Sequence, residues 1–386
     1  MSRRTVALDE TLHTAVAAGV PGVVALAATR EGVIYQGAAG VRRLGAPEPM
    51  TADTVLALWS CTKAITTAAA LQLWEQGALD LDAPAKTYAA EIAAIEVFDG
   101  FDAAGAPKFR APRREITTRM LLLHTAGFSY DFLNADYLRL RNEHGIGDPR
   151  HGRKHSLNVP LIFEPGERWE YSRSLDWVGQ VVEGVAGKTL DAVFAERIFA
   201  PLGMPSTAFV PTPEMEARRA SMHEFDAEGR LRPTPLNPIK PPDAFMGGGA
   251  LQGSAADFMR FLRAWLDDGG AILKPATVEY ASRNHLGGVG VRVLRSLDPA
   301  RSLDFDFVPG VEKSWALSFL RLEADTPSGR SAGSLSWGGL GNLYFWIDSK
   351  AGVTGFWAAQ YLPFLHPWAV EGYEAFEREV YRRLKR

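Results

Sequence analysis

Hydrophobic positions near the start of the chain predict one helix followed by two strands. Apolar residues recur at helical spacing from Leu8 to Val16 and stop at Gly19, a pattern typical of a short amphipathic helix. Two apolar runs follow at residues 22–30 and 32–41, and the Glu-Gly junction between them favours a hairpin.

The end of the chain has the same two patterns in reverse order. Strand-like runs occupy residues 313–322, 334–348 and 353–361, and a Ser-Lys-Ala-Gly turn separates the last two. A closing helix is predicted from apolar positions at helical spacing, namely Val370, Tyr373, Phe376, Val380 and Leu384. Strands at both ends with helices between them predict one antiparallel sheet built from both chain ends.

The middle of the chain, about residues 80–270, is mainly helical in pattern and broken by long Pro/Gly-containing loops. Residues 134–158 are charged and contain glycine, so we expect a surface loop there. The fold class expected is α/β (α+β), with the sheet flanked by helices and a mainly helical lobe beside it. We expect one catalytic unit spanning all 386 residues. Its α/β lobe would take in about residues 1–80 and 271–386, and its helical lobe about residues 81–270.

Composition and charge exclude several classes of protein. The net charge is −3 without a long basic block, which argues against nucleic acid as a partner. No apolar stretch approaches the roughly 18 residues that a membrane span needs, and Asp9 and Glu10 interrupt the start where a signal peptide would be apolar. Cys61 is the single cysteine, which excludes an internal disulfide and a cysteine-rich zinc site. We therefore expect a cytoplasmic enzyme without a metal or other cofactor.

Ser60 opens the most apolar helix expected in the chain, which ends near Gly77, and Lys63 follows one turn later. Residues three apart share a helix face, so the Lys63 amine can reach the Ser60 hydroxyl. A serine nucleophile needs a base within hydrogen-bond reach, and a lysine serves only if its surroundings lower its pKa. The apolar helix favours such a lowering. A serine at a helix start is nevertheless most often a cap, so this pair alone does not establish catalysis.

Two later motifs strengthen the catalytic interpretation. A tyrosine motif occurs at Tyr171 in FEPGERWEYSRSL, and a W-x-G motif occurs at Trp337 in SLSWGGLGN. With the S-x-x-K motif of Ser60 and Lys63, this order resembles the serine β-lactamase and penicillin-binding protein superfamily, closest to its class C-like family VIII carboxylesterases. The resemblance covers roughly residues 20–360 and includes LLLHTAGFSYDF and GGGALQGSAADFMRFL. It implies a β-lactamase/transpeptidase-like fold.

The resemblance also implies a role for individual residues. Ser60 would be the acyl-accepting nucleophile, and Lys63 and Tyr171 would share its proton network; which of these two takes the proton stays open. The oxyanion hole would use the backbone N–H groups of Ser60 and Leu340, and the small Gly339 would leave room for substrate at that strand edge. The residues expected to bind substrate are Trp337, Gly339, Leu340 and Tyr130.

Two departures from the family pattern bear on the substrate. Trp337 stands where β-lactamases have a cation, and Arg173 stands where an asparagine is expected two residues after the tyrosine. We expect Arg173 to face solvent. Both changes favour hydrolysis of neutral short-chain esters by a serine carboxylesterase. The alternatives are a β-lactamase, a D-alanyl-D-alanine peptidase, an acyltransferase of the same fold, or a non-catalytic ligand-binding module. A small-molecule ester is the partner expected.

Other reactive residues receive structural interpretations. A G-x-S-x-G motif surrounds Ser331, but its flanks are a polar turn and a strand, whereas a nucleophile elbow needs a buried strand and then a helix. Asp348 and His366, the partners such an elbow would require, have no supporting context. His124 lies at an expected helix end, where histidine commonly favours the helix dipole. Cys61 is expected to be a buried, inert thiol.

Overall fold

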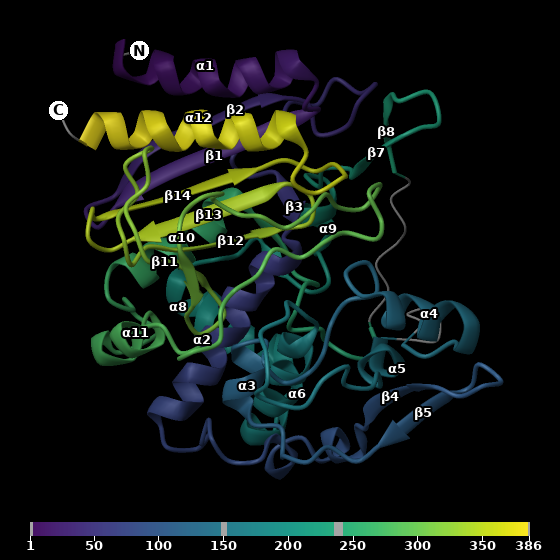
Figure 1. Ribbon diagram of the computed structural model, residues 1–386. Coiled ribbons are helices and arrows are strands. Elements are labelled where there is room, and N and C mark those ends of the chain that lie inside the picture. Colours follow the sequence, from purple (N-terminus) through teal and green to yellow (C-terminus); the bar gives the residue numbers. More distant parts are fainter. Residues whose placement is uncertain (1–2, 148–152, 235–241, 385–386) are drawn as a thin grey trace.

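A seven-stranded antiparallel sheet forms the centre of the computed structural model, which describes residues 3–147, 153–234 and 242–384 (Figure 1). The strand order is β10-β11-β12-β13-β14-β1-β2. Strands from the two chain ends meet where β1 pairs with β14, with Leu26 opposite Phe356. The strands are β1 Gly22–Thr29, β2 Val33–Gly40, β10 Lys313–Trp315, β11 Leu320–Leu322, β12 Leu335–Gly339, β13 Leu343–Asp348 and β14 Val353–Ala358. The predicted sheet and the hairpin β1–β2 are confirmed.

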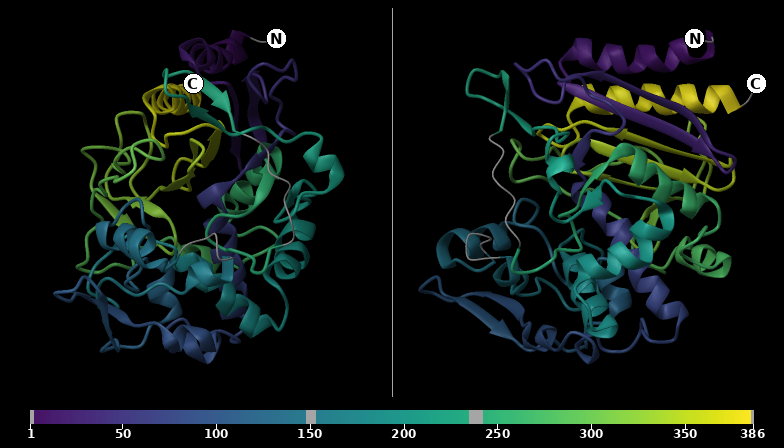
Figure 2. Two further views of the ribbon diagram at one scale, coloured as in Figure 1. Left: turned by 90° about the vertical axis from the view of Figure 1, so that its right-hand side faces the viewer. Right: turned by 180° about the vertical axis from the view of Figure 1, so that it is seen from behind.

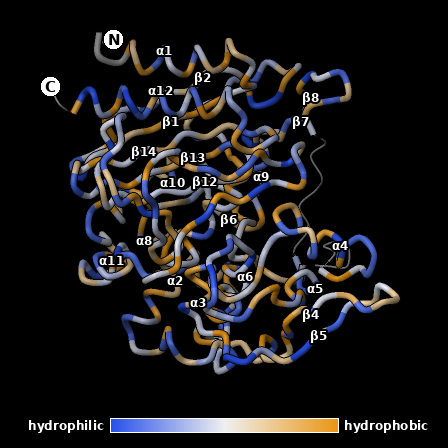
Figure 3. Tube along the Cα trace, in the orientation of Figure 1, coloured by the Kyte–Doolittle hydropathy of each residue, from blue (hydrophilic) through white to orange (hydrophobic). Residues whose placement is uncertain are grey.

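Helices cover both faces of this sheet. The terminal helices α1 (Arg3–Ala18) and α12 (Pro367–Leu384) lie side by side on one face, and α10 (Ala255–Leu266) packs on the other (Figures 1 and 2). Figure 3 shows the inner strands as mostly hydrophobic, whereas α12 alternates between hydrophilic and hydrophobic residues. Burial explains this contrast, because β12, β13 and β14 are buried along their whole length while α12 presents only one face to the sheet.

Helix α2 (Thr62–Glu75) connects the sheet to the helical region. Its residues from Thr62 to Leu73 are all buried, because α6 (Ser174–Ala186) packs beside it and the 3-10 turn η1 (Trp59–Cys61), which precedes it, packs against β12. This confirms the buried helix expected after Ser60. The end of β12 and the start of α2 therefore meet at the junction of the two regions.

Smaller elements complete the fold. The other helices are η2 Ala85–Thr87, η3 Ala90–Ala94, α3 Thr118–Leu122, α4 Ala135–His144, α5 Arg153–Leu157, α7 Leu190–Phe194, η5 Ala195–Phe199, α8 Ala200–Leu202, α9 Pro213–Glu216 and α11 Pro275–Ala281. The other strands are β3 Val55–Ala57, β4 Val97–Phe101, β5 Pro107–Arg110, β6 Thr207–Ala208, β7 His223–Phe225, β8 Leu231–Pro233 and β9 Gln252–Ser254. None of the described helices combines the length and the apolar character that a membrane crossing requires.

Two local predictions are wrong. The segment expected to be a loop, residues 134–158, contains α4 and α5. Asn134 caps α4 by accepting a hydrogen bond from the Tyr137 backbone, and Gly145 ends it at φ +67. Only Tyr137 and Leu140 of α4 are buried, so the sequence of this helix is mostly polar and has no apolar periodicity that would have predicted it.

The second error concerns residues 313–322 and 334–348, each of which was expected to form one strand. Residues 334–348 form the hairpin β12–β13, in which Gly339 pairs with Leu343. Residues 313–322 form the hairpin β10–β11, in which Trp315 pairs with Leu320 and Ser318 turns the chain at φ +63. The backbone N–H and the hydroxyl of Ser318 both donate to the Leu122 carbonyl. The turn itself is buried, so its apolar residues imitated a continuous strand.

Candidate active site

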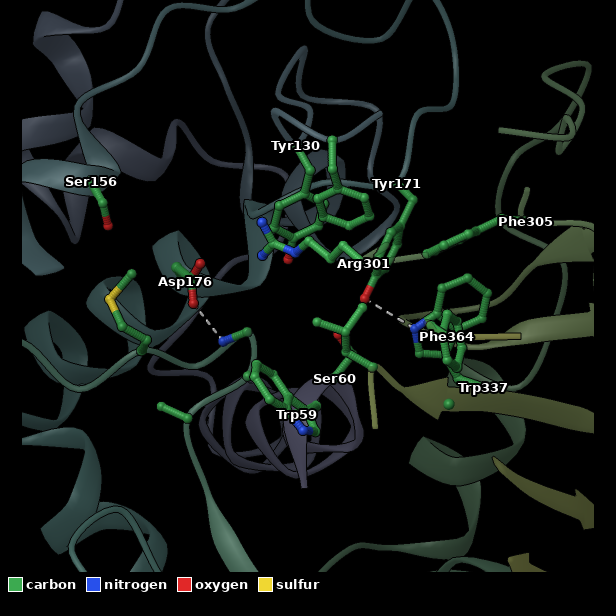
Figure 4. A pocket seen from close by; sticks show the side chains of 17 residues that line it. Trp59, Ser60, Tyr130, Ser156, Tyr171, Asp176, Arg301, Phe305, Trp337 and Phe364 are labelled. Atoms are coloured by element: carbon green, nitrogen blue, oxygen red, sulfur yellow. Dashed lines mark hydrogen bonds between the residues drawn. The ribbon is translucent and has the colours of Figure 1, made fainter. Parts of the chain in front are cut away.

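A strained turn presents the predicted nucleophile to a cavity. Ser60 lies in η1, directly before α2, and lines a cavity of about 340 Å³ (Figure 4). The residue before it, Trp59, has φ +48, a left-handed conformation that costs a non-glycine residue about 1–3 kcal/mol. Such strain persists only where the surrounding structure enforces it, and here it lies next to the expected reacting atom.

Lys63 lies in the first turn of α2 and is buried, with an exposed fraction of 1%. Its Nζ donates to Ser60 Oγ at 3.1 Å, to the Tyr130 hydroxyl at 3.1 Å and to the Gly248 carbonyl at 2.5 Å. An ammonium has three protons to donate, and these three acceptors match that number. The contacts therefore favour a protonated Lys63.

The electrostatic surroundings of Lys63 support the same state. Burial alone would lower the pKa of the Lys63 amine, but the Tyr130 and Tyr171 phenol oxygens and the Asp176 carboxylate outweigh burial, and the pKa is raised. The lowered lysine pKa favoured by the sequence is therefore wrong. That prediction considered only the apolar residues of the helix. It omitted the oxygen atoms of Tyr130, Tyr171 and Asp176, which other segments of the chain place near Lys63.

Tyr171 lies beside both Ser60 and Lys63. Figure 4 shows its hydroxyl pointing toward Ser60, and the indole N–H of Trp337 donates to that hydroxyl at 3.2 Å. Lys63 Nζ lies 4.9 Å from the centre of the Tyr171 ring. The structure thus brings together the three residues predicted to be catalytic, and Trp337 with them.

His124 supports the backbone on both sides of Tyr171. Its Nδ1 accepts a hydrogen bond from the Ser172 backbone N–H at 3.2 Å, and its carbonyl accepts one from the Glu170 N–H at 3.0 Å. Burial, together with the nearby charge of Lys63, lowers the pKa of His124 well below its usual value. The imidazole is therefore neutral, and its Nδ1 acts as a hydrogen-bond acceptor. His124 positions the backbone around Tyr171, a role that was not expected from its place at a helix end.

The edge of β12 lies against the turn that carries Ser60. A Cβ added to Gly339 would lie 2.6 Å from the Leu58 carbonyl oxygen and 3.2 Å from Trp59 Cβ, so only glycine permits this approach. The next residue, Leu340, lines the cavity together with Ser60. This placement suits the oxyanion hole that the resemblance implied.

Tyr130 contacts the reacting groups more directly than the sequence indicated. Burial raises the pKa of its phenol, with the Lys63 charge opposing this, so Tyr130 accepts the Lys63 hydrogen bond as a neutral phenol. The expectation that Arg173 faces solvent is wrong. Its guanidinium donates to the Ser156 carbonyl and lies 6.0 Å from the Tyr137 ring centre, and it does not contribute to the described lining of the active-site cavity.

Sequence reasoning missed several residues at this site, and Asp176 and Gly248 are a pair among them. The carboxylate of Asp176 accepts a hydrogen bond from the Gly248 N–H at 2.6 Å, and a Cβ on Gly248 would meet that same carboxylate oxygen. The G-G-G run and an acidic residue opening an apolar helix were the available signals for this pair. Arg301, Phe305 and Phe364 also line the cavity, but they lie on irregular segments without a motif.

The rejected nucleophile elbow has a structural role. The backbone N–H of Ser331 donates to Asp348 Oδ2 at 2.7 Å, which fixes a turn before β12. His366 Nδ1 contacts the Tyr361 hydroxyl at 3.4 Å. Among the hydrogen bonds of the described residues, none joins His366 to Ser331 or Asp348, so no triad forms there.

Comparisons with known proteins agree with this geometry. The family model described as "Beta-lactamase" matches residues 8–377. Lovastatin esterase of Penicillium rubens is 33% identical, over 97% of this chain and 98% of its own. Monacolin J acid methylbutanoyltransferase of Aspergillus terreus is 32% identical, over 94% of this chain and 92% of its own. The unliganded structure of simvastatin synthase from Aspergillus terreus superposes with a TM-score of 0.86, at 28% identity and 99% coverage of both chains. The superfamily resemblance and the fold predicted from the motifs are thereby confirmed.

Proposed function

This chain belongs to the beta-lactamase family and is a serine hydrolase or acyltransferase of that fold, and we propose that it is a carboxylesterase acting on neutral short-chain esters through an acyl-enzyme on Ser60. The observation that carries the proposal is the hydrogen bond from Lys63 to Ser60 Oγ, beside Tyr171 and at the base of an apolar cavity. A cap at a helix start needs no buried ammonium, whereas an attacking hydroxyl needs a proton acceptor within reach and a group that stabilises the charge that develops.

In the proposed acylation step, Tyr171 acts as a phenolate and takes the proton from the Ser60 hydroxyl, while Oγ bonds to the ester carbonyl carbon and the carbonyl electron pair moves to the carbonyl oxygen. Lys63 remains an ammonium and stabilises the negative charge that moves between the two oxygens. The same proton then passes to the alcohol oxygen as the ester C–O bond breaks. A water molecule repeats the sequence on the acyl-enzyme, which releases the acid and restores Ser60.

The oxyanion formed on the carbonyl carbon would accept hydrogen bonds from the backbone N–H groups of Ser60 and Leu340. Their proximity follows from the close contact of Gly339 with the Ser60 turn. Because this contact is set by backbone packing, the donors are in place before substrate arrives, which is the condition for a large rate effect.

The lining of the cavity favours an uncharged acyl group. Seven of its seventeen described lining residues are aromatic, and these are Trp59, Tyr130, Phe132, Tyr171, Phe305, Trp337 and Phe364. At the position of the β-lactamase cation, Trp337 offers one N–H, and Tyr171 already accepts it. Arg301 supplies a cation elsewhere in the lining, but it lies 4.5 Å from the Phe132 ring centre and 3.7 Å from the Asp131 carboxylate.

A second candidate function is transfer of the acyl group to an alcohol in place of water. Its support is the 32% identity to a protein named as a methylbutanoyltransferase, over nearly the whole of both chains. An aromatic cavity also favours an alcohol with apolar surface over water. Adding 1-butanol to a p-nitrophenyl butyrate reaction separates the two functions. Butyric acid is the main product expected of the esterase, and butyl butyrate that of the transferase.

Substrate preference tests the proposal that the enzyme hydrolyses neutral short-chain esters. We expect kcat/KM for p-nitrophenyl butyrate to exceed that for a chromogenic cephalosporin by at least tenfold, because each missing charge-assisted contact costs about 1.5–3 kcal/mol. The assay must follow opening of the lactam ring, since some cephalosporins carry an acetyl ester. Ring opening at equal or greater efficiency would favour a β-lactamase and refute the esterase.

A further inference from the structure

Gln360 is a buried amide just beyond the end of β14, with an exposed fraction of 2%. It is not among the described residues that line the active-site cavity, but its side chain contacts the chain that leads to Ser60. Its Oε1 accepts a hydrogen bond from the Ala57 backbone N–H at 3.0 Å, and its Nε2 donates to the Ala57 carbonyl at 3.2 Å and to the Ala359 carbonyl at 2.7 Å. Both amide protons and the amide oxygen are thus engaged in hydrogen bonds.

The Gln360 amide takes the place of a missing strand neighbour of β3. One edge of β3 pairs with β9, where Ala57 lies opposite Gln252. Because backbone N–H and C=O groups alternate between the two edges of a strand, Ala57 directs its groups toward the other edge, as Val55 does. Val55 exchanges hydrogen bonds there with residues 218–220, and Ala57 exchanges its two with the Gln360 side chain. The amide therefore holds this end of β3 as a paired strand would.

The backbone on either side of Gln360 holds the loop that carries Leu340. The N–H of the preceding residue donates to the Asn342 carbonyl at 3.2 Å, and that of the following residue donates to the Gly341 carbonyl at 3.4 Å. The Gln360 side chain meanwhile holds β3, which ends three residues before Ser60. One residue thus connects the two segments whose N–H groups would form the oxyanion hole.

The packing around this connection leaves little room for movement. A Cβ added to Gly341 would lie 3.1 Å from Gln360 Nε2 and 3.1 Å from Trp59 Nε1, so the loop lies close against both side chains. Trp59 has the left-handed φ of +48, and such a conformation persists only while its surroundings enforce it. Gln360 holds the chain two residues before Trp59, where its hydrogen bonds resist relaxation of the turn.

The main chain of Gln360 is fixed as well. The His223 backbone N–H donates to the Gln360 carbonyl at 3.0 Å, and His223 Nδ1 lies 3.0 Å from the same oxygen. His223 Nε2 accepts from the Leu44 N–H at 3.1 Å, so the neutral ring has its proton on Nδ1 and donates it to that carbonyl. Burial lowers the pKa of His223, which favours this neutral state. A fixed main chain gives the Gln360 side chain a fixed reach to Ala57.

We propose that Gln360 is a positioning residue for the oxyanion hole: it joins the strand that leads to Ser60 to the loop that carries Leu340, and it sets the separation of their backbone N–H groups. The inference rests on the proposed function, since it assumes that an oxyanion forms between these two groups. Loss of the Gln360 contacts should slow formation and hydrolysis of the acyl-enzyme and leave binding of the ester largely unchanged. The reason is that the N–H groups bind the oxyanion more strongly than the ground-state carbonyl.

The first variant is Gln360→Met, which removes the three side-chain hydrogen bonds while keeping a similar volume. We expect kcat for p-nitrophenyl butyrate to fall about 10- to 100-fold and KM to change less than about threefold. Inhibition by 1-butaneboronic acid is the second measurement, because its boron bonds to Ser60 Oγ and gives a tetrahedral adduct with an oxygen in the oxyanion hole. The inhibition constant should rise by a factor similar to the fall in kcat.

Gln72→Met is the matched control. Gln72 is 7% exposed on α2, and its Nε2 donates to the carbonyls of Arg197 and Ile272. Both variants lose hydrogen bonds of a buried glutamine, so both should lower the urea midpoint of unfolding. Only Gln360→Met should weaken catalysis and boronate binding, whereas Gln72→Met should leave both within about twofold of the unsubstituted enzyme.

Gln360→Glu tests the geometry with the shape of the side chain retained. The introduced carboxyl group can still accept from the Ala57 N–H, and as a neutral acid it can donate to one carbonyl. Burial against two carbonyl oxygens favours that neutral form. At pH 6 we expect Gln360→Glu to retain a kcat at least about threefold higher than that of Gln360→Met. Should Gln360→Met not fold, the same measurements on Gln360→Glu decide, with a fall in kcat of about threefold or more and an unchanged KM expected.

The outcomes separate this inference from the proposed function. An unchanged kcat in Gln360→Met, equal losses of kcat in Gln360→Met and Gln72→Met, or a constant boronate inhibition constant while kcat falls would each overturn the inference and leave the proposed function intact. An unsubstituted enzyme that is neither acylated at Ser60 by the ester nor inhibited by the boronate would refute the proposed function, and the inference with it. Opening of a cephalosporin in place of ester hydrolysis would refute only the ester preference. A lactam carbonyl uses the same oxyanion hole, so Gln360→Met should then lower that turnover.

Discussion

Lys63 and Arg330 are both buried cations, but their partners differ in kind. Arg330 is hydrogen-bonded to the Glu377 carboxylate, which balances its charge directly. Lys63 instead donates to a serine hydroxyl, a phenol and a backbone carbonyl. Its charge is stabilised by oxygen atoms that are neutral or more distant.

The difference separates a structural cation from a functional one. A carboxylate partner holds a cation in one state, because breaking the pair leaves an unbalanced buried charge. Hydroxyl and phenol partners can lose or gain a proton while the ammonium stays in place, so negative charge can develop beside Lys63 during reaction. The surroundings of Lys63 thus suit catalysis, and those of Arg330 suit stability.

The largest effect is expected from removing the groups around Ser60. Lys63→Ala and Tyr171→Phe should each lower kcat/KM for p-nitrophenyl butyrate by about 10³-fold or more, because they act on one proton. The double variant should lose little beyond either single variant. Losses that multiply independently would contradict the shared role. Ser331→Ala is the control and should keep most activity.

Breaking the structural pair should affect stability instead of catalysis. Glu377→Gln leaves the Arg330 charge unbalanced and should lower the free energy of unfolding by about 3–5 kcal/mol, measured by urea denaturation. We expect kcat/KM of the folded enzyme to change less than about twofold. Glu196→Gln, in the exposed pair with Lys188, should cost less than about 1 kcal/mol. Equal losses at the two pairs would remove the distinction drawn between buried and exposed partners.

A pH effect on stability is expected from His124. Its pKa is lowered in the folded state, so the unfolded chain binds a proton more readily and stability falls as pH drops through the unfolded value of about 6.5. The slope from this residue is up to about 1.4 kcal/mol per pH unit. His124→Asn should flatten the profile between pH 7 and pH 5. An unchanged slope would show that other groups, such as the buried His223, account for it.

The smallest effect is expected from Arg301, the half-exposed cation of the cavity. Arg301→Gln should change kcat/KM for p-nitrophenyl butyrate by less than about threefold, because a neutral acyl group gains little from a solvent-screened charge. The same variant assayed with p-nitrophenyl hemiglutarate measures any contribution to an anionic group. A large loss confined to the neutral ester would contradict the proposed preference.

The sequence predicted elements with strong patterns and missed those whose causes lie elsewhere in the chain. Helix spacing was sufficient to predict that Lys63 reaches Ser60, because the two residues are one turn apart. That Tyr171 joins them was predicted only from the resemblance to the superfamily, since its motif lies more than 100 residues further along the chain. The raised pKa of Lys63 could not be predicted, since it depends on oxygen atoms from separate segments. Arg301 was missed because it lies on an irregular segment, where no periodic pattern or motif indicates which cavity a side chain will line. Helix α4 was missed because its stability comes from a cap and two buried residues, not from an apolar stripe.

Trapping the acyl group tests the central claim most directly. Rapid quenching of the enzyme with p-nitrophenyl butyrate, followed by intact-mass and peptide analysis, should show one butyryl group on the peptide that contains Ser60. Ser60→Ala should carry none. Acylation of the Ser331 peptide, or turnover by Ser60→Ala at the rate of the unchanged enzyme, would contradict the assignment of Ser60 as the nucleophile.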